Sequence, residues 1–270
     1  METNVIYNED CIGENGMCRL PDDSIDMILA DLPYGTTLCD WDSVIDLDKL
    51  WIQYERIIKN NAAIVLTSSE PFTSALITSN LKLFKYKWKW IKNTCANFMT
   101  AKYKPLKYTE EIPVFSKGGV NTNTKNKMKY FPQGLKKINK NQNKNYHTEE
   151  KGVFKYNRLN NKNYQQEYTN YPKDYLEFDM DKKKYHPTQK PVALFEYLIK
   201  TYTNKNEVVL DNVIGSGTTA IACLKTNRKF IGFEKEEKYY NIALKRIGKF
   251  DKSYYKELPK SERPAQKQLF

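Results

Sequence analysis

The segment Val208–Thr219 constrains the fold most strongly, because it runs from an apolar strand through a turn with two glycines into a helix. Its sequence is V-V-L-D-N-V-I-G-S-G-T-T, with Gly215 and Gly217 in the turn. Such a turn lets a ligand approach the backbone closely, and the following helix N-terminus favours a negative group. The next strand ends at Glu234, 23 residues after Asp211. A carboxylate at that place can accept hydrogen bonds from two ribose hydroxyls.

The glycine turn differs from the loops that bind phosphates. Ala220 occupies the position of the third glycine in G-x-G-x-x-G, and the lysine of a P-loop is missing. The sequence therefore favours a nucleoside ligand without phosphates over NAD or ATP. Taken alone, the turn is also compatible with an ordinary tight connection between a strand and a helix.

A second apolar strand also ends in polar and aromatic residues. Ile25–Ala30 is followed by Asp31, Leu32, Pro33 and Tyr34. Ligands of open α/β sheets bind at the carboxyl ends of the strands. We therefore expect this strand end to lie beside the glycine turn, although about 180 residues separate them in the chain. A proline turn without any function is the alternative.

Strand and helix patterns alternate along the chain. Period-two or apolar runs predict seven strands at residues 4–7, 25–30, 62–66, 86–91, 112–115, 207–210 and 229–233. Helical periodicity falls between them, at residues 48–59, 71–80, 191–202, 219–225 and 237–247. Strands separated by helices predict an α/β fold with a mainly parallel sheet.

Positive charge is concentrated in one stretch of the chain. Residues 117–184 carry fifteen Lys and one Arg against seven acidic residues, which is nine of the twelve net positive charges. The stretch is rich in Asn and Tyr and poor in aliphatic residues, so it predicts an inserted basic module with nucleic acid as the first candidate partner. A solvated linker, with Lys and Asn enriched by an A+T-rich genome, is the alternative. The chain then divides into residues 1–116, 117–184, 185–250 and a polar tail at 251–270.

Cysteine, histidine and hydropathy patterns exclude several classes of protein. Five cysteines without a C-x-x-C pair and only two histidines argue against a zinc site or a disulfide framework, so no metal is expected. Reduced thiols are typical of the cytoplasm. No run reaches the roughly 18 apolar residues of a membrane span, and no signal-peptide core is present. We expect a soluble cytoplasmic protein.

Three motifs together resemble one enzyme family. Asp31-Leu32-Pro33-Tyr34 is similar to the D-P-P-Y motif of amino-methyltransferases, and residues 211–219 resemble their D-P-F-x-G-S-G-T-T motif. Residues 186–191 match the H-P-T-Q-K-P of the β-class DNA amino-methyltransferases. The order of the motifs, with a variable insertion after D-P-P-Y, also matches that class. The resemblance spans residues 4–247 apart from the insertion.

This resemblance implies a circularly permuted, Rossmann-like methyltransferase fold whose basic insertion recognises the target. It implies transfer of a methyl group from S-adenosyl-L-methionine to the exocyclic amino group of adenine in double-stranded DNA, after the base is flipped out. The chain is also similar to small methyltransferases of phages and prophages, which implies a bacterial cytoplasm. The resemblance leaves open whether the enzyme is a homodimer and whether a restriction partner exists.

The resemblance also assigns site residues. Asp31 and the carbonyl of Leu32 would each accept one N–H of the target amine, next to Pro33, and Tyr34 would stack on the base. The implied donor-binding residues are Asp10, Cys11, Asp31, Thr188, Lys190, Asp211, Gly215, Ser216, Gly217, Thr218 and Glu234. A helix-capping role is the alternative for Asp10. Trp90 and Phe98 are candidates for a second wall of the base pocket, with core packing as the alternative for both.

Two departures from the family pattern keep other functions open. Leu32 replaces the first Pro of D-P-P-Y, and Asn212-Val213-Ile214 replaces the usual Pro-Phe. These changes would suit a non-catalytic DNA-binding protein with a degenerate methyltransferase fold. Methylation of the exocyclic amino group of cytosine could use the same kind of pocket, so this function also stays open. RNA or protein methylation is disfavoured because the related N-P-P-Y motif has Asn at the position of Asp31. Cytosine-C5 methylation is set aside because no cysteine follows a proline.

Overall fold

The structure is a computed structural model and describes residues 1–35, 43–96, 98–142, 164–183, 185 and 188–251. The chain divides into two compact units. Unit 1 comprises Met1–Phe131 and Asp174–Phe270, and unit 2 comprises Pro132–Lys173. The charge-based limits of the insertion, 117 and 184, stay a prediction. The tail beyond residue 251 and most of the centre of the insertion lie outside the described residues.

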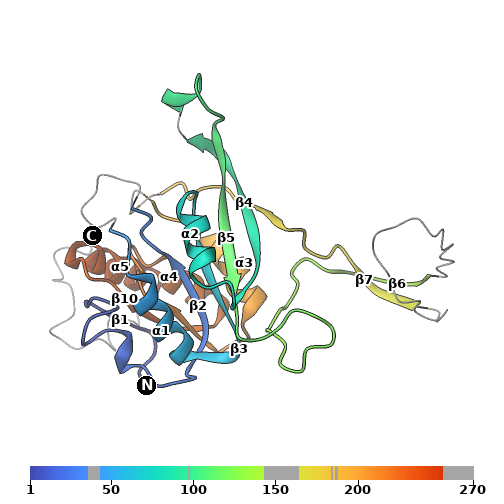
Figure 1. Ribbon diagram of the computed structural model, residues 1–270, viewed down its shortest axis with the longest axis horizontal. Helices are drawn as coiled ribbons and strands as arrows, with labels where there is room; N and C mark the ends of the chain where they lie inside the picture. Colours follow the sequence, from blue (N-terminus) through green and yellow to red (C-terminus); the bar gives the residue numbers. More distant parts are fainter. Residues whose placement is uncertain (36–42, 97, 143–163, 184, 186–187, 252–270) are drawn as a thin grey trace. The chain divides into compact units, whose positions relative to one another are not determined.

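Unit 1 is built on one eight-stranded sheet (Figure 1), whose order is β1-β10-β9-β2-β3-β5-β4-β8. Five of the seven strand pairings are parallel, and only β5 pairs antiparallel with its neighbours. The strands are β1 Val5–Tyr7, β2 Ile25–Asp31, β3 Ile58–Thr67, β4 Phe84–Ala96, β5 Lys107–Phe115, β8 Tyr175–Glu177, β9 Val208–Asp211 and β10 Lys229–Phe233.

The mainly parallel α/β sheet is confirmed, but the expected number of seven strands is wrong. The extra strand is β8, which adds to the edge of β4 through Trp90 and its neighbours. Its three residues are too few to show a period-two pattern, and they fall in the stretch that charge alone assigned to the insertion.

Helices cover both faces of the sheet. Helices α1 (Leu47–Ile57) and α2 (Phe72–Ser79) pack on one face, and α3 (Val192–Tyr202), α4 (Thr218–Thr226) and α5 (Glu237–Phe250) pack on the other (Figure 1). The strands alternate accordingly. In β2, Met27 and Leu29 join the α3–α5 side of the core, and Ile28 and Ala30 join the α1–α2 side. All four are fully buried, so β2 is a central strand.

The register of the parallel strands brings their carboxyl ends to one edge. Asp31 at the end of β2 pairs with Thr67 at the end of β3. Asp211 at the end of β9 pairs with Gly232 of β10, and β10 runs in parallel with β1. Because β2 and β9 are also neighbours, the residues that follow these strands lie together.

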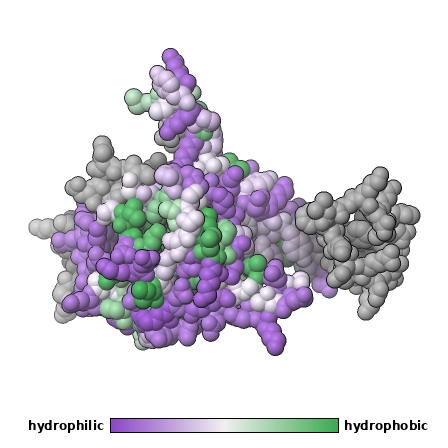
Figure 2. Space-filling model, in the orientation of Figure 1, coloured by the Kyte–Doolittle hydropathy of each residue, from purple (hydrophilic) through white to green (hydrophobic). Residues whose placement is uncertain are grey.

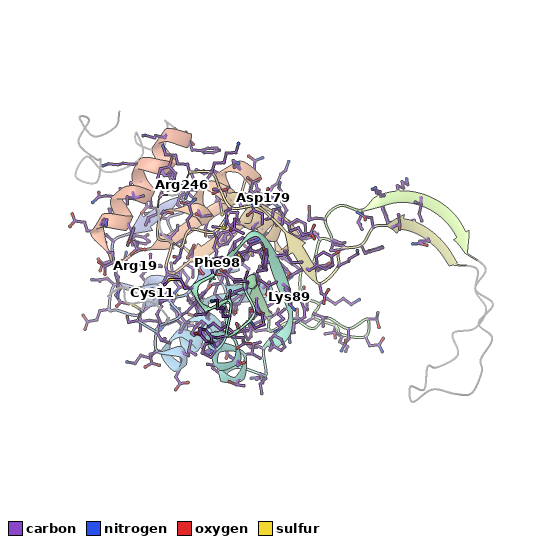
Figure 3. The ribbon with its side chains drawn as sticks, turned by 90° about the horizontal axis from the view of Figure 1, so that it is seen from above. Cys11, Arg19, Lys89, Phe98, Asp179 and Arg246 are labelled. Carbon is purple, nitrogen blue, oxygen red and sulfur yellow. The ribbon has the colours of Figure 1, made fainter. Side chains whose placement is uncertain are left out.

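Strands β4 and β5 form a long antiparallel hairpin that extends beyond the helices (Figure 1). At its base the strands alternate, so that Trp88 and Trp90 are buried and Lys87 and Lys89 are exposed. A short 3₁₀ helix, Phe98–Thr100, follows β4. The side chain of Phe98 is 77% exposed (Figure 3).

Unit 2 contains the antiparallel pair β6 (Lys136–Gln142) and β7 (Tyr164–Thr169). The residues between these strands are outside the described part of the chain. In the view of Figure 2 the described surface is mainly hydrophilic, with only small hydrophobic areas on unit 1. None of the helices in the described ranges combines the length and apolarity that a bilayer span requires.

Candidate functional site

A cavity of about 1010 Å³ opens at the carboxyl edge of the sheet in unit 1. Its wall contains the residues that follow four parallel strands, at 9–12, 31–34, 211–216 and 233–236, together with part of the β4–β5 hairpin. The strand end with Asp31 and the glycine turn therefore line one cavity, as the sequence predicts.

The glycine turn connects β9 to α4 at the floor of this cavity. Asp211 is fixed there, because its Oδ1 accepts the N–H of Val213 at 3.1 Å and its Oδ2 accepts the hydroxyl of Thr219. Gly215 lines the cavity and has φ +54°. Gly217 has φ +81° but does not line the cavity. A Cβ there would lie 3.2 Å from that of Ala243, so this glycine permits the turn and the close packing of α5.

Glu234 holds the glycine turn from the neighbouring strand. Its Oε2 accepts the N–H of Gly215 at 2.9 Å, and its Oε1 accepts the N–H of Glu236 at 2.9 Å. A carboxylate has about four lone-pair sites, so each oxygen keeps acceptor capacity towards the cavity. Glu234 is therefore preorganised to accept two further hydrogen bonds.

Asp31 has three donors at the opposite wall. Its Oδ1 accepts the hydroxyls of Tyr34 at 2.7 Å and Thr67 at 2.5 Å. Its Oδ2 accepts the ammonium of Lys190 at 2.6 Å. The ring of Tyr34 stacks on Phe72, with centroids 5.4 Å apart. One face of Tyr34 is therefore supported by the protein.

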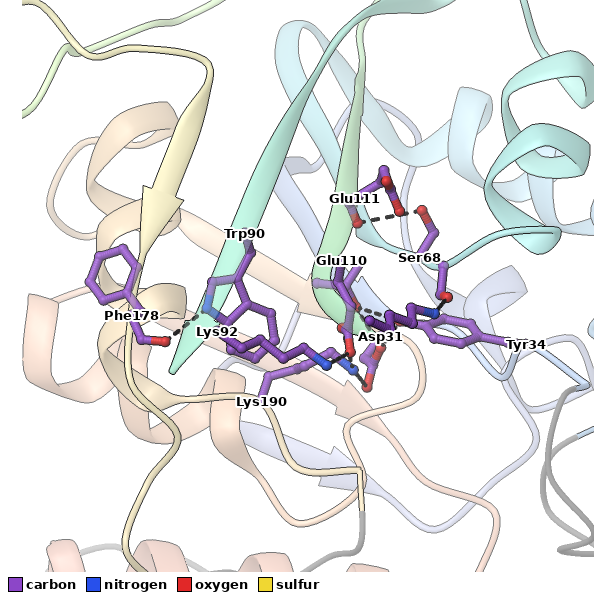
Figure 4. A network of polar contacts seen from close by, with 12 residues as sticks. Asp31, Tyr34, Ser68, Trp90, Lys92, Glu110, Glu111, Phe178 and Lys190 are labelled. Atoms are coloured by element: carbon purple, nitrogen blue, oxygen red, sulfur yellow. Dashed lines mark hydrogen bonds and ion pairs between the residues drawn. The ribbon is translucent and has the colours of Figure 1, made fainter. Parts of the chain in front are cut away.

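Two charged residues of the hairpin, Lys92 and Glu110, lie beside Asp31 and Lys190 (Figure 4). The Lys190 ammonium lies 3.5 Å from Glu110, which also pairs with Lys92. Burial alone would raise the pKa of Glu110, but the two ammonium groups outweigh burial and lower that pKa. Sequence reasoning missed Glu110, Lys92 and Thr67. The available signal was a charge at an inward position, since Lys92 follows Trp88 and Trp90 at period two.

Most of the other predicted site residues also line the cavity: Asp10, Cys11, Leu32, Pro33, Thr188, Ser216 and Thr218. Asp10 also accepts the N–H of Ile12 at 2.9 Å, so it supports the turn that follows β1. Trp90 lines the cavity and is fully buried, with its indole N–H donating to the carbonyl of Phe178. Phe98 is not brought to the cavity. His186 and Pro187 lie outside the described residues.

The charge of the cavity differs from that of the chain. Nine carboxylate side chains and six lysines line it, whereas the whole chain carries a net charge of +12. An acidic cavity favours a cationic ligand and disfavours one with phosphates. Among the described residues, no group of three or more His, Cys, Asp or Glu side chains could hold a metal ion.

A family model described as DNA methylase matches residues 25–245. The chain belongs to this DNA methylase family. The match runs from the start of β2 into α5, so it includes the strand ends with Asp31 and Asp211, whereas the cavity residues 9–12 precede it. The strand ends with Asp31 and Asp211 are thus parts of the family's shared core.

Similar proteins match shorter stretches. The chain is 47% identical over 68 residues to Type II methyltransferase M.HindIII of Haemophilus influenzae, covering 25% of this chain and 22% of that protein. It is 41% identical over 68 residues to DNA adenine methyltransferase YhdJ of Escherichia coli, covering 25% of this chain and 23% of that protein. The chain thus spans about a quarter of the length of these relatives.

One solved structure resembles most of the chain. The M1.HpyAVI–SAM complex has a TM-score of 0.57 and 26% sequence identity, and the match covers 89% of this chain and 98% of that one. This likeness supports the α/β architecture of unit 1.

The two departures from the family motifs have local structural explanations. Asn212 lies in the core, where its Oδ1 accepts the hydroxyl of Tyr54 at 2.5 Å and its Nδ2 donates to Cys11 Sγ at 3.3 Å. The amide therefore ties the glycine turn to α1 and to the turn after β1. The side chain of Leu32 is buried on the α1–α2 side of the sheet. Leu32 nevertheless remains one of the residues that line the cavity.

Asp211 should make the stability of the protein depend on pH. Burial raises the pKa of its carboxyl from 3.8 to about 7. The folded state then binds the proton more tightly than the unfolded state. The contribution of Asp211 to the free energy of unfolding is therefore fully present below about pH 4 and is lost as the pH rises through about 7. In Asp211→Asn this loss should be absent. Urea unfolding of both proteins at a series of pH values measures it, and parallel stability curves would contradict the assignment.

Proposed function

We propose that this chain transfers a methyl group from S-adenosyl-L-methionine to the exocyclic amino group of adenine in double-stranded DNA. One observation carries the proposal. Asp31 and Glu234 lie far apart within the range that matches the DNA methylase family, and both line one cavity. One relative is named a DNA adenine methyltransferase, and one structural neighbour is a SAM complex.

The donor half of the cavity fits a charged nucleoside without phosphates. S-adenosylmethionine has a sulfonium and an ammonium, and the cavity wall has more carboxylates than lysines. Glu234 would accept hydrogen bonds from the two ribose hydroxyls. Gly215 would let the ligand approach the backbone, and Asp10 would contact the adenine ring of the donor. Bound there, S-adenosylmethionine supplies an electrophilic methyl group.

The acceptor half fits an amine whose lone pair is delocalised into its ring. Asp31 would accept one N–H and the Leu32 carbonyl the other, which directs the nitrogen lone pair towards the methyl group. In transfer, a bond forms from nitrogen to the methyl carbon while the carbon–sulfur bond breaks, and one amine proton passes to Asp31 or solvent. Tyr34, supported by Phe72, would stack on the base. Positioning of this kind can supply roughly 7–11 kcal/mol.

The base must leave the duplex to reach Asp31, at a cost of a few kcal/mol. We attribute target recognition to residues 117–184, in which Lys136 and Lys137 of β6 are exposed. Lysines would contact phosphates, and Asn or Gln side chains could read base edges. The catalytic half at 1–116 and the donor-binding half at 185–250 would then act on the recognised site.

The direct experiment is methyl transfer from labelled S-adenosylmethionine to duplex DNA of mixed sequence, followed by sequencing that identifies modified bases. We expect N6-methyladenine at a defined site. Detection of N4-methylcytosine instead would show that the target base is cytosine, while the type of reaction would be the same. Donor binding without any transfer would indicate a DNA-binding protein with an inactive methyltransferase fold.

A further inference from the structure

The acceptor half of the cavity contains a second carboxylate that the reaction described above does not use. Glu110 lies on β5 with its side chain only 12% exposed, and its Oε1 accepts the ammonium of Lys92. Its Oε2 is buried and has no hydrogen-bond partner within the described part of the chain. A buried charged acceptor without a donor is costly. A donor is therefore expected to reach Glu110 Oε2 in another state of the enzyme.

A candidate donor is the ammonium of Lys190, whose side chain is 6% exposed. Lys190 Nζ lies 2.6 Å from Asp31 Oδ2 and 3.5 Å from Glu110 Oε2 (Figure 4). Burial would lower the pKa of Lys190, but Asp31 and Glu110 raise it above its ordinary value. One cationic group is thus shared unequally between two carboxylates, and it stays charged beside either of them.

The resting position of Lys190 opposes the proposed chemistry. Asp31 Oδ1 already accepts from Tyr34 and Thr67, so Oδ2 is the oxygen best placed to accept the amine. The ammonium occupies that oxygen, and its charge lies close to a nitrogen that becomes positive during methyl transfer. A movement of roughly 0.7 Å towards Glu110 would give a normal charged hydrogen bond. That movement would satisfy Glu110 and would lengthen the contact between the ammonium and Asp31 Oδ2 from 2.6 Å to at most about 3.3 Å, which weakens the hold of Lys190 on that oxygen.

We propose that Glu110 is a positioning residue that draws the Lys190 ammonium away from Asp31 when the acceptor base enters. Asp31 Oδ2 then accepts the N–H of the amine, while Lys92 keeps Glu110 neutralised. The inference rests on the proposed function, because it requires an amine as the methyl acceptor.

The first test is Glu110→Gln, which preserves the size of the side chain but removes its charge. Lys190 should then remain on Asp31. We expect kcat for DNA methylation to fall about tenfold, as is typical of residues coupled in one ionic network, while the KM for S-adenosylmethionine is unchanged. The matched control is Glu111→Gln on the opposite side of β5, where the backbone of Glu111 pairs with Ser68. Its kcat should equal that of the wild-type chain.

A double-variant cycle separates this role from a merely structural one. If Glu110 acts through Lys190, Glu110→Gln should lower kcat about tenfold in the wild-type chain but by less than about twofold in Lys190→Gln. Equal effects in both backgrounds would overturn the inference.

A binding measurement covers the case in which Lys190→Gln is too slow to assay. With S-adenosylhomocysteine bound, the wild-type chain should prefer duplex with the target base over duplex whose purine lacks the amino group. Glu110→Gln should reduce that preference, and an unchanged preference would contradict the inference. If the wild-type chain methylates no DNA, both proposals fail. If it methylates DNA and Glu110→Gln matches it, only the role of Glu110 fails.

Discussion

Replacing Asp31 by Asn is expected to lower the rate of methyl transfer by about a thousandfold, within the range for loss of a group that assists proton transfer or charge development. An amide has one acceptor oxygen and no charge, so it cannot accept an amine proton as a carboxylate does. Donor binding should be largely retained, because Asp211 ends β9 and Glu234 directly follows β10, so neither belongs to β2. Single-turnover transfer of a labelled methyl group measures the first effect, and calorimetry with S-adenosylmethionine measures the second.

The matched control is Asp26→Asn, which removes a buried carboxylate from the other end of β2. Asp26 accepts from Lys59 at 2.7 Å, Lys129 at 3.3 Å and the N–H of Val208 at 3.1 Å. Breaking this cluster should lower the free energy of unfolding by about 3 kcal/mol without changing turnover per folded molecule. Turnover near the wild-type value in Asp31→Asn would remove Asp31 from the mechanism.

The sequence predicts which strand ends line the cavity, because each of these strand ends has a recognisable local sequence pattern. An apolar run followed by Asp31, and another followed by Asp211 and two glycines, each mark a strand end. Parallel pairing then brings both ends to one edge of the sheet. This step needs no knowledge of side-chain contacts, and it correctly joined segments far apart in the chain.

The parts that sequence could not supply depend on contacts between distant side chains. Lys190 was expected only as a donor-binding residue, and its hydrogen bond to Asp31 could not be read from the motif. Glu110 carries no motif, and only the pairing of β5 with β4 brings it into the cavity. Phe98 is a plausible aromatic wall by position, but the hairpin exposes it to solvent. Gly217 belongs to the glycine motif, and its structural reason is the close approach of Ala243.

Replacing Glu234 by Gln is expected to raise the KM for S-adenosylmethionine by about tenfold to a hundredfold, the value of one hydrogen bond to a charged group. At saturating donor, kcat should change little, because the ribose contacts are equal in the ground state and the transition state. The amide oxygen can still accept the N–H of Gly215, which preserves the support of the glycine turn, whereas the hydrogen bond from the N–H of Glu236 is lost because the amide nitrogen cannot accept it. Initial rates at varied donor concentration measure both constants.

A donor analogue that lacks one ribose hydroxyl provides the decisive comparison for Glu234. The analogue should bind the wild-type chain about as weakly as S-adenosylmethionine binds Glu234→Gln, and its affinity should respond little to the substitution. Glu237→Gln, at an exposed position in the first turn of α5, should leave the KM unchanged. If Glu234→Gln lowers kcat at an unchanged KM, Glu234 does not hold the ribose. Its two backbone hydrogen bonds would then be its main role, as a support for the turn that begins α4.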